Sequence, residues 1–163
     1  MDRRGRQELY FQVDGSTTGY SYDASGNIDL VTLPNGNHID YVYDTASRLT
    51  QITDDAGNSI QYTYDTQGNM MREERKDATG AIKTYLDMQY DALNRLKKVT
   101  NPDSAFTEYG YDPNGNRTAL TDPNGNVTSY EYDALNKMSR MIQPGSVNTV
   151  LTYDTQDHLS NVT

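Results

Sequence analysis

The chain has 163 residues, with 14 Lys or Arg, 23 Asp or Glu and a formal net charge of −9. So acidic a surface repels phosphate backbones and anionic membrane surfaces, so we expect no nucleic-acid partner. No apolar stretch approaches ~18 residues, so we expect no membrane insertion. The chain has no cysteine, only 34% hydrophobic residues and 14 tyrosines, so disulfides and Cys nucleophiles are excluded and any core is predicted to be thin and aromatic.

An aspartate recurs along the chain with a period of 21 residues. The recurring positions are Asp2, Asp23, Asp44, Asp65, Asp91, Asp112, Asp133 and Asp154, with one step of 26 between Asp65 and Asp91. A fixed period of this length is typical of a tandem-repeat architecture. We therefore predict that residues 1–163 form a single repeat array, with repeats starting near each of these aspartates.

A tyrosine-rich strand is predicted to end at each aspartate, in the signature Tyr-x-Tyr-Asp. Its residues are Tyr20, Tyr22, Asp23, Tyr41, Tyr43, Asp44, Tyr62, Tyr64, Asp65, Tyr90, Asp91, Tyr109, Tyr111, Asp112, Tyr130, Tyr132, Asp133, Tyr153 and Asp154. Alternation with period two places both tyrosines on one face, as in Ile39-Asp40-Tyr41-Val42-Tyr43. We interpret these tyrosines as the half-buried packing face of a sheet.

A turn is predicted after each signature. The third residue beyond the aspartate is a turn-former: Gly5, Gly26, Ser47, Gly68, Asn94, Gly115, Asn136 or Asp157. We expect the aspartate to accept hydrogen bonds from the N–H groups of the turn, and this third residue to adopt positive φ.

A second strand follows, and a second turn ends it. Apolar residues recur five and eight positions after the aspartate, as in Leu49 and Ile52, whereas Gln7, Arg117 and Glu73 depart from the pattern. Because these slots are three apart, we expect a bulge or a strong twist in this strand. The mid-repeat turn includes Pro34-Asn35-Gly36-Asn37 and Pro123-Asn124-Gly125-Asn126, which suit a tight turn.

The five-residue insertion lies near 70–76, a segment with good helix formers. A short helix there is one reading. We favour a lengthened β-hairpin, because turn signals recur about every ten residues on both sides of the insertion.

The repeated residues are compatible with three functional alternatives. Exposed tyrosine rings could form a carbohydrate platform, and the aspartate turns could bind Ca²⁺, although the 12-residue calcium-loop pattern is absent. Carboxylate-based hydrolysis is disfavoured because a catalytic residue is usually singular and these aspartates are replicated. The two histidines, His38 and His158, are expected to lack nearby acids that are unique to them. We thus predict no catalytic, cofactor-binding or metal-binding residue and no cofactor.

The combined pattern Gly-x₅-Tyr-x-Tyr-Asp-x-x-Gly-Asn/Arg-Leu resembles the YD repeat of the RHS/YD-repeat proteins. Its best copies run from Gly57 to Met70 and from Gly125 to Met138. The resemblance implies β-hairpins that spiral into a hollow shell around a cargo, as in Tc toxins, Rhs toxins and teneurins. It also implies a bacterial protein that is secreted or displayed on the cell surface as part of a larger chain. This sequence shows no signal-peptide pattern.

Members that cleave themselves carry an Asp-Pro-x-Gly core. Asp112-Pro113-Asn114-Gly115 and Asp122-Pro123-Asn124-Gly125 look similar, but both occupy ordinary repeat positions, so self-cleavage is not inferred.

The sequence therefore predicts an all-β protein: about fourteen antiparallel strands in one twisted sheet, curled as a partial shell, β-spiral or open barrel. The expected function is structural, as a segment of an encapsulating shell of a polymorphic toxin or surface protein. The alternative is a glycan-binding or cell-surface-binding module that uses the tyrosine-rich face. Expected partners are an enclosed segment or neighbouring repeats, with self-association through free sheet edges.

Overall fold

The computed structural model describes residues 1, 4–11 and 15–163. Its elements are β1 (Leu9–Phe11), β2 (Thr17–Tyr22), β3 (Ile28–Thr32), β4 (His38–Tyr43), β5 (Leu49–Asp54), β6 (Ser59–Tyr64), β7 (Met70–Lys76), β8 (Ile82–Tyr90), β9 (Leu96–Thr100), β10 (Phe106–Tyr111), β11 (Arg117–Thr121), β12 (Val127–Tyr132), β13 (Met138–Gln143), β14 (Val147–Tyr153) and β15 (Leu159–Val162). The all-β prediction is confirmed, with fifteen strands rather than about fourteen. Across the described ranges, no helix is long and apolar enough to span a membrane. The first repeat aspartate, Asp2, lies outside the described residues.

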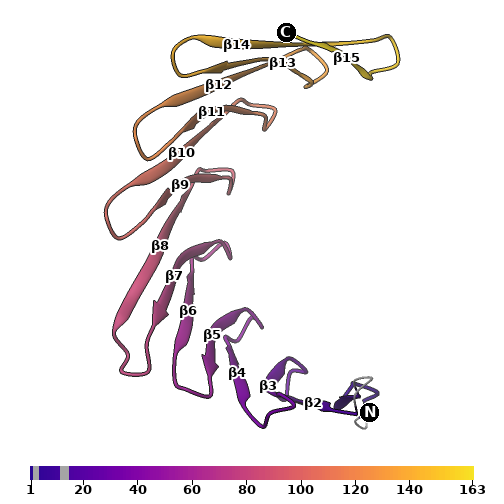
Figure 1. Cartoon of the computed structure of the whole chain (residues 1–163), viewed down its shortest axis with the longest axis vertical. Helices are drawn as coiled ribbons and strands as arrows, with labels where there is room; N and C mark the ends of the chain where they lie inside the picture. The colour runs from indigo at the N-terminus through magenta and orange to yellow at the C-terminus, as the bar shows by residue number, and fades with distance from the viewer. Residues whose placement is uncertain (2–3, 12–14) are drawn as a thin grey trace. The chain divides into compact units, whose positions relative to one another are not determined.

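The strands follow one another in the sheet in sequence order, from β1 to β15 (Figure 1). The order does not return to β1, so the sheet is not closed into a barrel. The chain divides into two compact segments, Met1–Leu86 and Asp87–Thr163, which are described separately below. Each segment is a meander of hairpins, as a turn signal every ten residues dictates.

Every signature hairpin contains a β-bulge at the same place. In the hairpin of β4 and β5, Val42 pairs with Gln51 but Tyr43 pairs with Leu49, so Thr50 is the extra residue. The same shift occurs in the hairpins that begin with β2, β6, β8, β10, β12 and β14. The bulge is the physical reason for the three-residue spacing of the apolar slots, because it turns both slots to the face that carries the tyrosines. The expected irregularity of this strand is confirmed.

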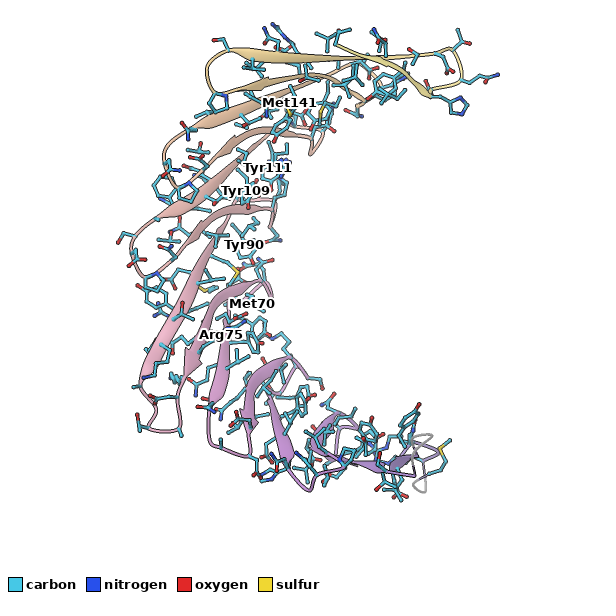
Figure 2. The ribbon with its side chains drawn as sticks, in the orientation of Figure 1. Met70, Arg75, Tyr90, Tyr109, Tyr111 and Met141 are labelled. Atoms are coloured by element: carbon cyan, nitrogen blue, oxygen red, sulfur yellow. The ribbon has the colours of Figure 1, made fainter. Side chains whose placement is uncertain are left out.

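The sheet has one apolar face, here called the tyrosine face, which carries both signature tyrosines and the two apolar slots. Tyr41 lies opposite Ile52, and Tyr43 lies opposite Leu49. In the C-terminal segment, Tyr109 lies opposite Leu120, and Figure 2 labels Tyr90, Tyr109 and Tyr111 on this face. Among the described residues no hydrophobic side chain is fully buried, so packing is confined to half-buried contacts along one layer, as the composition predicts.

The reverse face carries polar side chains that bridge adjacent strands. Lys76 Nζ donates to Gln61 Oε1 at 2.6 Å, and Gln61 Nε2 donates to Gln51 Oε1 at 3.1 Å. Such cross-strand pairs stabilise the sheet without an apolar cover.

The insertion lengthens β7 and β8, which have 7 and 9 residues. The lengthened hairpin is confirmed, and the helical reading of 70–76 is wrong. The segment's strand pairing with β6 explains why: every residue from Met70 to Lys76 except the bulged Met71 has a partner in β6.

Candidate functional site: the signature turns and the tyrosine face

The signature aspartate organises the turn that follows it. Asp65 Oδ1 accepts hydrogen bonds from the N–H groups of Gln67 at 2.9 Å and Asn69 at 2.8 Å, and Oδ2 accepts one from Asn69 Nδ2 at 2.8 Å. The main chain closes the turn, with Gly68 N–H donating to Asp65 O at 3.2 Å and Asp65 N–H to Asn69 O at 2.9 Å. The third residue has positive φ at Gly5, Gly26, Ser47, Gly68, Asn94, Gly115, Asn136 and Asp157, as expected. Positive φ explains why Gly, Asn, Asp or Ser occupies this slot.

These hydrogen bonds lower the pKa of each signature carboxyl. In Asp23, Asp65 and Asp112 the main cause is the amide of the Asn four residues on. In Asp44, Asp91, Asp133 and Asp154 the main cause is the main-chain N–H of the basic residue at that position. A carboxylate held in this way is a weak proton acceptor, which does not suit a general base.

The mid-repeat turns have the same geometry, which sequence reasoning missed. Asp122 Oδ1 accepts hydrogen bonds from the N–H groups of Asn124 at 2.8 Å and Asn126 at 2.9 Å. Asp54 and Asp77 hold their turns in the same way, and Leu33 begins the corresponding turn without a carboxylate. The sequence signal was the Asp directly before Pro123, one position earlier than the predicted turn.

The residue four positions after each signature aspartate links one repeat to the next. It is basic in Arg6, Arg48, Arg95, Lys137 and His158, and Asn in Asn27, Asn69 and Asn116. The two kinds alternate from Arg6 to Lys137, and His158 then follows Lys137 as a second basic residue.

An arginine in this position bonds to its own turn and covers the next. Arg48 Nε pairs with Asp44 Oδ2 at 2.7 Å, and Nη1 donates to Asp65 O at 3.3 Å. Its guanidinium lies 4.7 Å from the ring centre of Tyr64. Arg95 repeats the arrangement in the C-terminal segment, with Asp112 O at 2.8 Å and the Tyr111 ring at 4.6 Å. Each such residue therefore combines a charge-assisted hydrogen bond with a cation–π contact.

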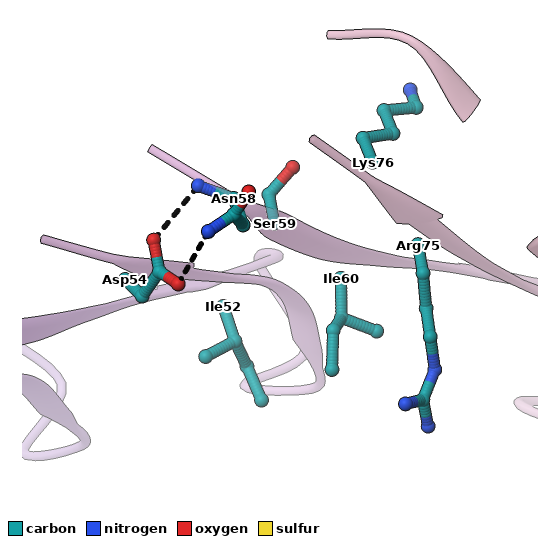
Figure 3. Close-up of a pocket in the computed structure, with 7 residues that line it drawn as sticks. All are labelled: Ile52, Asp54, Asn58, Ser59, Ile60, Arg75 and Lys76. Carbon is teal, nitrogen blue, oxygen red and sulfur yellow. Dashed lines mark hydrogen bonds between the residues drawn. The ribbon is translucent and has the colours of Figure 1, made fainter. Parts of the chain in front are cut away.

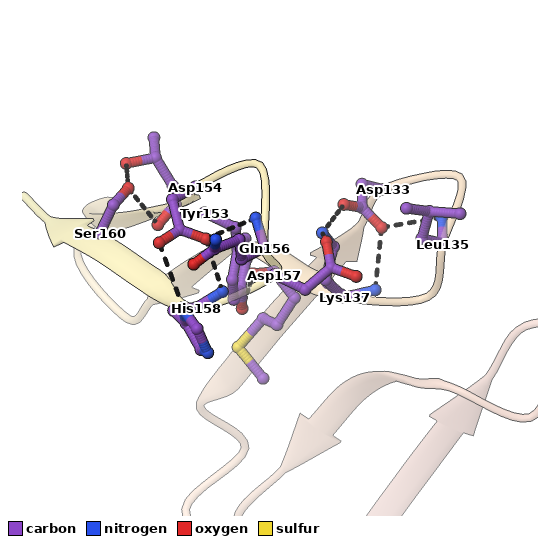
Figure 4. Close-up of polar contacts among 11 residues, drawn as sticks. Asp133, Leu135, Lys137, Tyr153, Asp154, Gln156, Asp157, His158 and Ser160 are labelled. Carbon is purple, nitrogen blue, oxygen red and sulfur yellow. Dashed lines mark hydrogen bonds and ion pairs between the residues drawn. The ribbon is translucent and has the colours of Figure 1, made fainter.

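An asparagine in this position reaches the third turn residue of the next repeat. Asn27 Nδ2 donates to Ser47 Oγ at 3.3 Å, and Asn116 Nδ2 to Asn136 Oδ1 at 2.8 Å. Lys137 Nζ makes the analogous contact to Asp157 Oδ1 at 2.6 Å and so joins the two turns drawn in Figure 4. The signature turns are thus joined to each other by side chains.

The second signature tyrosine also joins repeats. Tyr64 donates its hydroxyl hydrogen to Leu49 O at 2.7 Å, fifteen residues earlier. Tyr22, Tyr111, Tyr132 and Tyr153 make the same bond to Gln7, Leu96, Arg117 and Met138. Desolvation raises the pKa of Tyr64 and Tyr132, so both hydroxyls remain donors at neutral pH. With the hydroxyl bonded and a cation over the ring in several copies, these tyrosines serve to connect hairpins.

The surroundings of His38 correct one expectation. Its Nδ1 lies 2.5 Å from Asp55 Oδ1 and its Nε2 lies 3.3 Å from Asp40 Oδ2, so the prediction that it lacks nearby acids is wrong. Asp55 belongs to the next mid-repeat turn, which sequence distance concealed. Within the described ranges no three His, Asp or Glu side chains are arranged to hold a metal ion.

Comparison with family models decides what these repeats are. The model described as RHS Repeat matches residues 30–59, 43–82, 90–127 and 111–147, which together exceed half of the chain. The chain belongs to the RHS repeat family. A search of curated proteins found no match.

Solved structures share the fold of this RHS chain. The Photorhabdus luminescens Tc holotoxin pore carrying the TccC3-D651A mutation matches with a TM-score of 0.82 and 13% identity, over 98% of this chain and 10% of that chain. The TcdB2-TccC3-TEV structure matches with a TM-score of 0.77 and 13% identity, over 93% of this chain and 9% of that chain. This RHS chain therefore spans about a tenth of the length of the chains whose fold it shares.

Proposed function

We propose that this chain is a structural wall: a run of RHS hairpins that forms part of an encapsulating shell in a larger, secreted bacterial toxin or surface protein. The membership in the RHS repeat family and the fold shared with Tc toxin structures support the scaffold role. The enclosed partner would be a segment of the same parent protein.

The observation that carries the proposal is the bonding between successive repeats. Arg48 and Tyr64 tie the hairpin of β4 and β5 to that of β6 and β7, through Asp65 O and Leu49 O. Because the described residues contain no buried hydrophobic core, nearest-neighbour contacts of this kind hold the array together. A single layer joined in this way can extend as a wall.

The proposal includes a non-catalytic role for this chain. Its most regular carboxylates are committed to turn N–H groups and have lowered pKa values. The second signature tyrosines are engaged by main-chain carbonyls and cations, which leaves less ring surface for stacking on sugars. Free backbone groups on the outer edges of β1 and β15 would pair with neighbouring repeats or with another copy.

Protection from protease tests the wall. The reading frame that contains this chain is expressed with its flanking sequence, and the fate of a flanking segment is followed by mass spectrometry during digestion. We expect that segment to survive in the wild-type protein and to be digested in a Tyr64→Ala/Tyr111→Ala variant. Val42→Ala, on the reverse face and half exposed, is the matched control. A flanking segment digested equally fast in all three proteins overturns the proposal.

A further inference from the structure

One repeat replaces an apolar residue on the tyrosine face with charge. Eight residues after Asp65 stands Glu73, where other repeats carry residues such as Ile52 or Val99. Glu73 lies opposite Tyr62, and Arg75 lies opposite Ile60. Both charged residues are therefore on the tyrosine face, within the hairpin that carries the insertion.

A shallow pocket of about 280 Å³ adjoins this pair in the N-terminal segment, lined by Ile52, Asp54, Asn58, Ser59, Ile60, Arg75 and Lys76. Figure 3 shows Ile52, Ile60 and Arg75 extending to one side of the strands and Lys76 to the other. Asp54 is engaged by Asn58, which donates from its main-chain N–H and from Nδ2, both at 2.8 Å. The pocket thus presents two aliphatic side chains beside one guanidinium.

Most of the N–H donors of the Arg75 guanidinium are available to a ligand. Its Nε pairs with Glu73 Oε1 at 3.0 Å, where the Arg75 side chain is 60% exposed and that of Glu73 is 22% exposed. A guanidinium has five N–H donors. Among the described residues, neither Nη atom of Arg75 forms a hydrogen bond with a protein acceptor. Glu73 holds the side chain in place and leaves its outer edge facing solvent.

We propose that this pocket binds a carboxylate that is carried next to an aliphatic side chain, as at an acidic residue or chain end of an extended peptide. Two parallel N–H groups of Arg75 match the two carboxylate oxygens. Ile52 and Ile60 cover the aliphatic group. A phosphate dianion fits less well, because one arginine would face it beside Glu73 in a chain of net charge −9.

The inference deepens the proposed function, on which its biological meaning rests: the occupant is an extended part of the enclosed segment. It names where that segment touches the wall and what it must carry. The pocket itself is testable on the isolated chain, so its failure is distinguishable from failure of the wall.

The test titrates the ¹⁵N,¹³C-labelled 18.4 kDa chain with N-acetylleucine and, as the neutral control, N-acetylleucinamide. We expect N-acetylleucine to shift the methyl signals of Ile52 and Ile60 and the Nε signal of Arg75, with no comparable shifts from the amide. Arg75→Gln should weaken binding about tenfold or more. Arg140→Gln is the matched variant, since Arg140 is 40% exposed and pairs with Glu131 at 3.5 Å in the other segment, and it should leave binding unchanged.

Two results overturn the proposal: equal shifts from acid and amide, or unchanged affinity in Arg75→Gln. Because Arg75→Gln removes the ion pair with Glu73 and could disturb the hairpin, Arg75→Lys provides a second, independent test of binding. It keeps the charge but lacks the planar fork, so binding intermediate between wild type and Arg75→Gln is expected. Binding by Arg75→Lys as tight as wild type would also overturn the bidentate geometry.

Discussion

The two edges of the hairpin array have the same turns but different connections. On the edge formed by the signature turns, side chains cross from each turn to the next, as Arg48 does to Asp65 and Asn116 to Asn136. On the edge formed by the mid-repeat turns, the described contacts between neighbours are the ion pair of His38 with Asp55, and Ala78, whose Cβ lies 3.4 Å from the place of a Cβ added to Gly57.

The two edges have different roles, although their turns are similar in sequence. Asp65 and Asp122 hold their own turns with the same hydrogen bonds, so the local fold does not distinguish the edges. What distinguishes them is the residue that reaches the next repeat. We infer that the signature edge, where such links recur from turn to turn, sets how consecutive hairpins are stacked, whereas the main role of the mid-repeat edge is to close each hairpin.

Acid is expected to have the largest effect and to begin at the turns held by an aspartate, on either edge. Folded Asp carboxyls there have pKa values below the ordinary value of about 3.9, as Asp23, Asp44 and Asp65 illustrate. A lowered folded pKa contributes stability above pH 4 that is lost as the pH falls below it. Melting temperature should therefore be flat from pH 7 to about 5 and fall steeply below about 4.

Amide hydrogen exchange followed by NMR shows which turns lose protection first as the pH falls. Mid-repeat turns that begin with Leu33, Asn101 or Gln143 have no carboxylate at that position. Their amides should keep protection to lower pH than those of the signature turns. Simultaneous loss of protection in the turns with and without a carboxylate would contradict the expectation.

Matched glycine substitutions come next. Gly68 on the signature edge and Gly36 on the mid-repeat edge both have positive φ, so Val at either should cost about 1–3 kcal/mol of unfolding free energy from backbone strain. At Gly68 the added Cβ would already be in van der Waals contact with Arg48 Nη1, at 3.7 Å, so the valine methyl groups beyond it would crowd Arg48, whereas nothing lies within 4 Å at Gly36. Urea unfolding should therefore show a greater loss for Gly68→Val. Equal losses would argue against the Arg48 link.

Removing one tyrosine hydroxyl isolates a single inter-repeat bond. Tyr64→Phe deletes the donor to Leu49 O, which should cost about 1 kcal/mol. Tyr41→Phe is the internal control, because it lies on the same face opposite Ile52 and forms none of the hydroxyl-to-carbonyl bonds described above. If both variants lose the same stability, the hydroxyl bond has no special role.

A double-mutant cycle between Arg48 and Tyr64 is the finest test. With Arg48→Met and Tyr64→Leu, the coupling from the 4.7 Å contact should be about 0.5–1 kcal/mol. Arg95 and Tyr111 should give a similar value in the C-terminal segment, since their separation is 4.6 Å. Zero coupling in both cycles would show that the stacked geometry contributes nothing to stability.

Local features of the fold were predictable because their causes are local. The spacing of Leu49 and Ile52 indicated a bulge, and the turn residues three positions after each aspartate indicated positive φ; both are present. The single-array boundaries remain a prediction. The first residue of the mid-repeat turn was predicted one position too late. Pro34 and Pro123 are strong turn signals, but proline favours the second residue of a turn, so the turn begins at the residue before it.

Contacts between repeats could not be predicted from the sequence. The bond from Tyr64 to Leu49 spans fifteen residues and depends on how two hairpins stack. The acids around His38 were missed for the same reason, since Asp55 comes from the following turn. Glu73 was visible as an exception, but only strand pairing places it beside Arg75 on the tyrosine face.

The alternation of Asn and basic residues at the linking position has a consequence for how such an array can change its length. Asn27, Asn69 and Asn116 each follow a glycine, whereas Arg48, Arg95 and Lys137 follow Ser47, Asn94 and Asn136. Deleting one 21-residue copy would bring two linkers of the same kind together; loss of the copy that contains Gly68, for example, would leave Arg48 facing a turn whose third residue is Asn94. Adding or removing copies in pairs would preserve the alternation of linkers, so the sequence pattern repeats every second 21-residue unit, whereas the hairpin repeats in every unit.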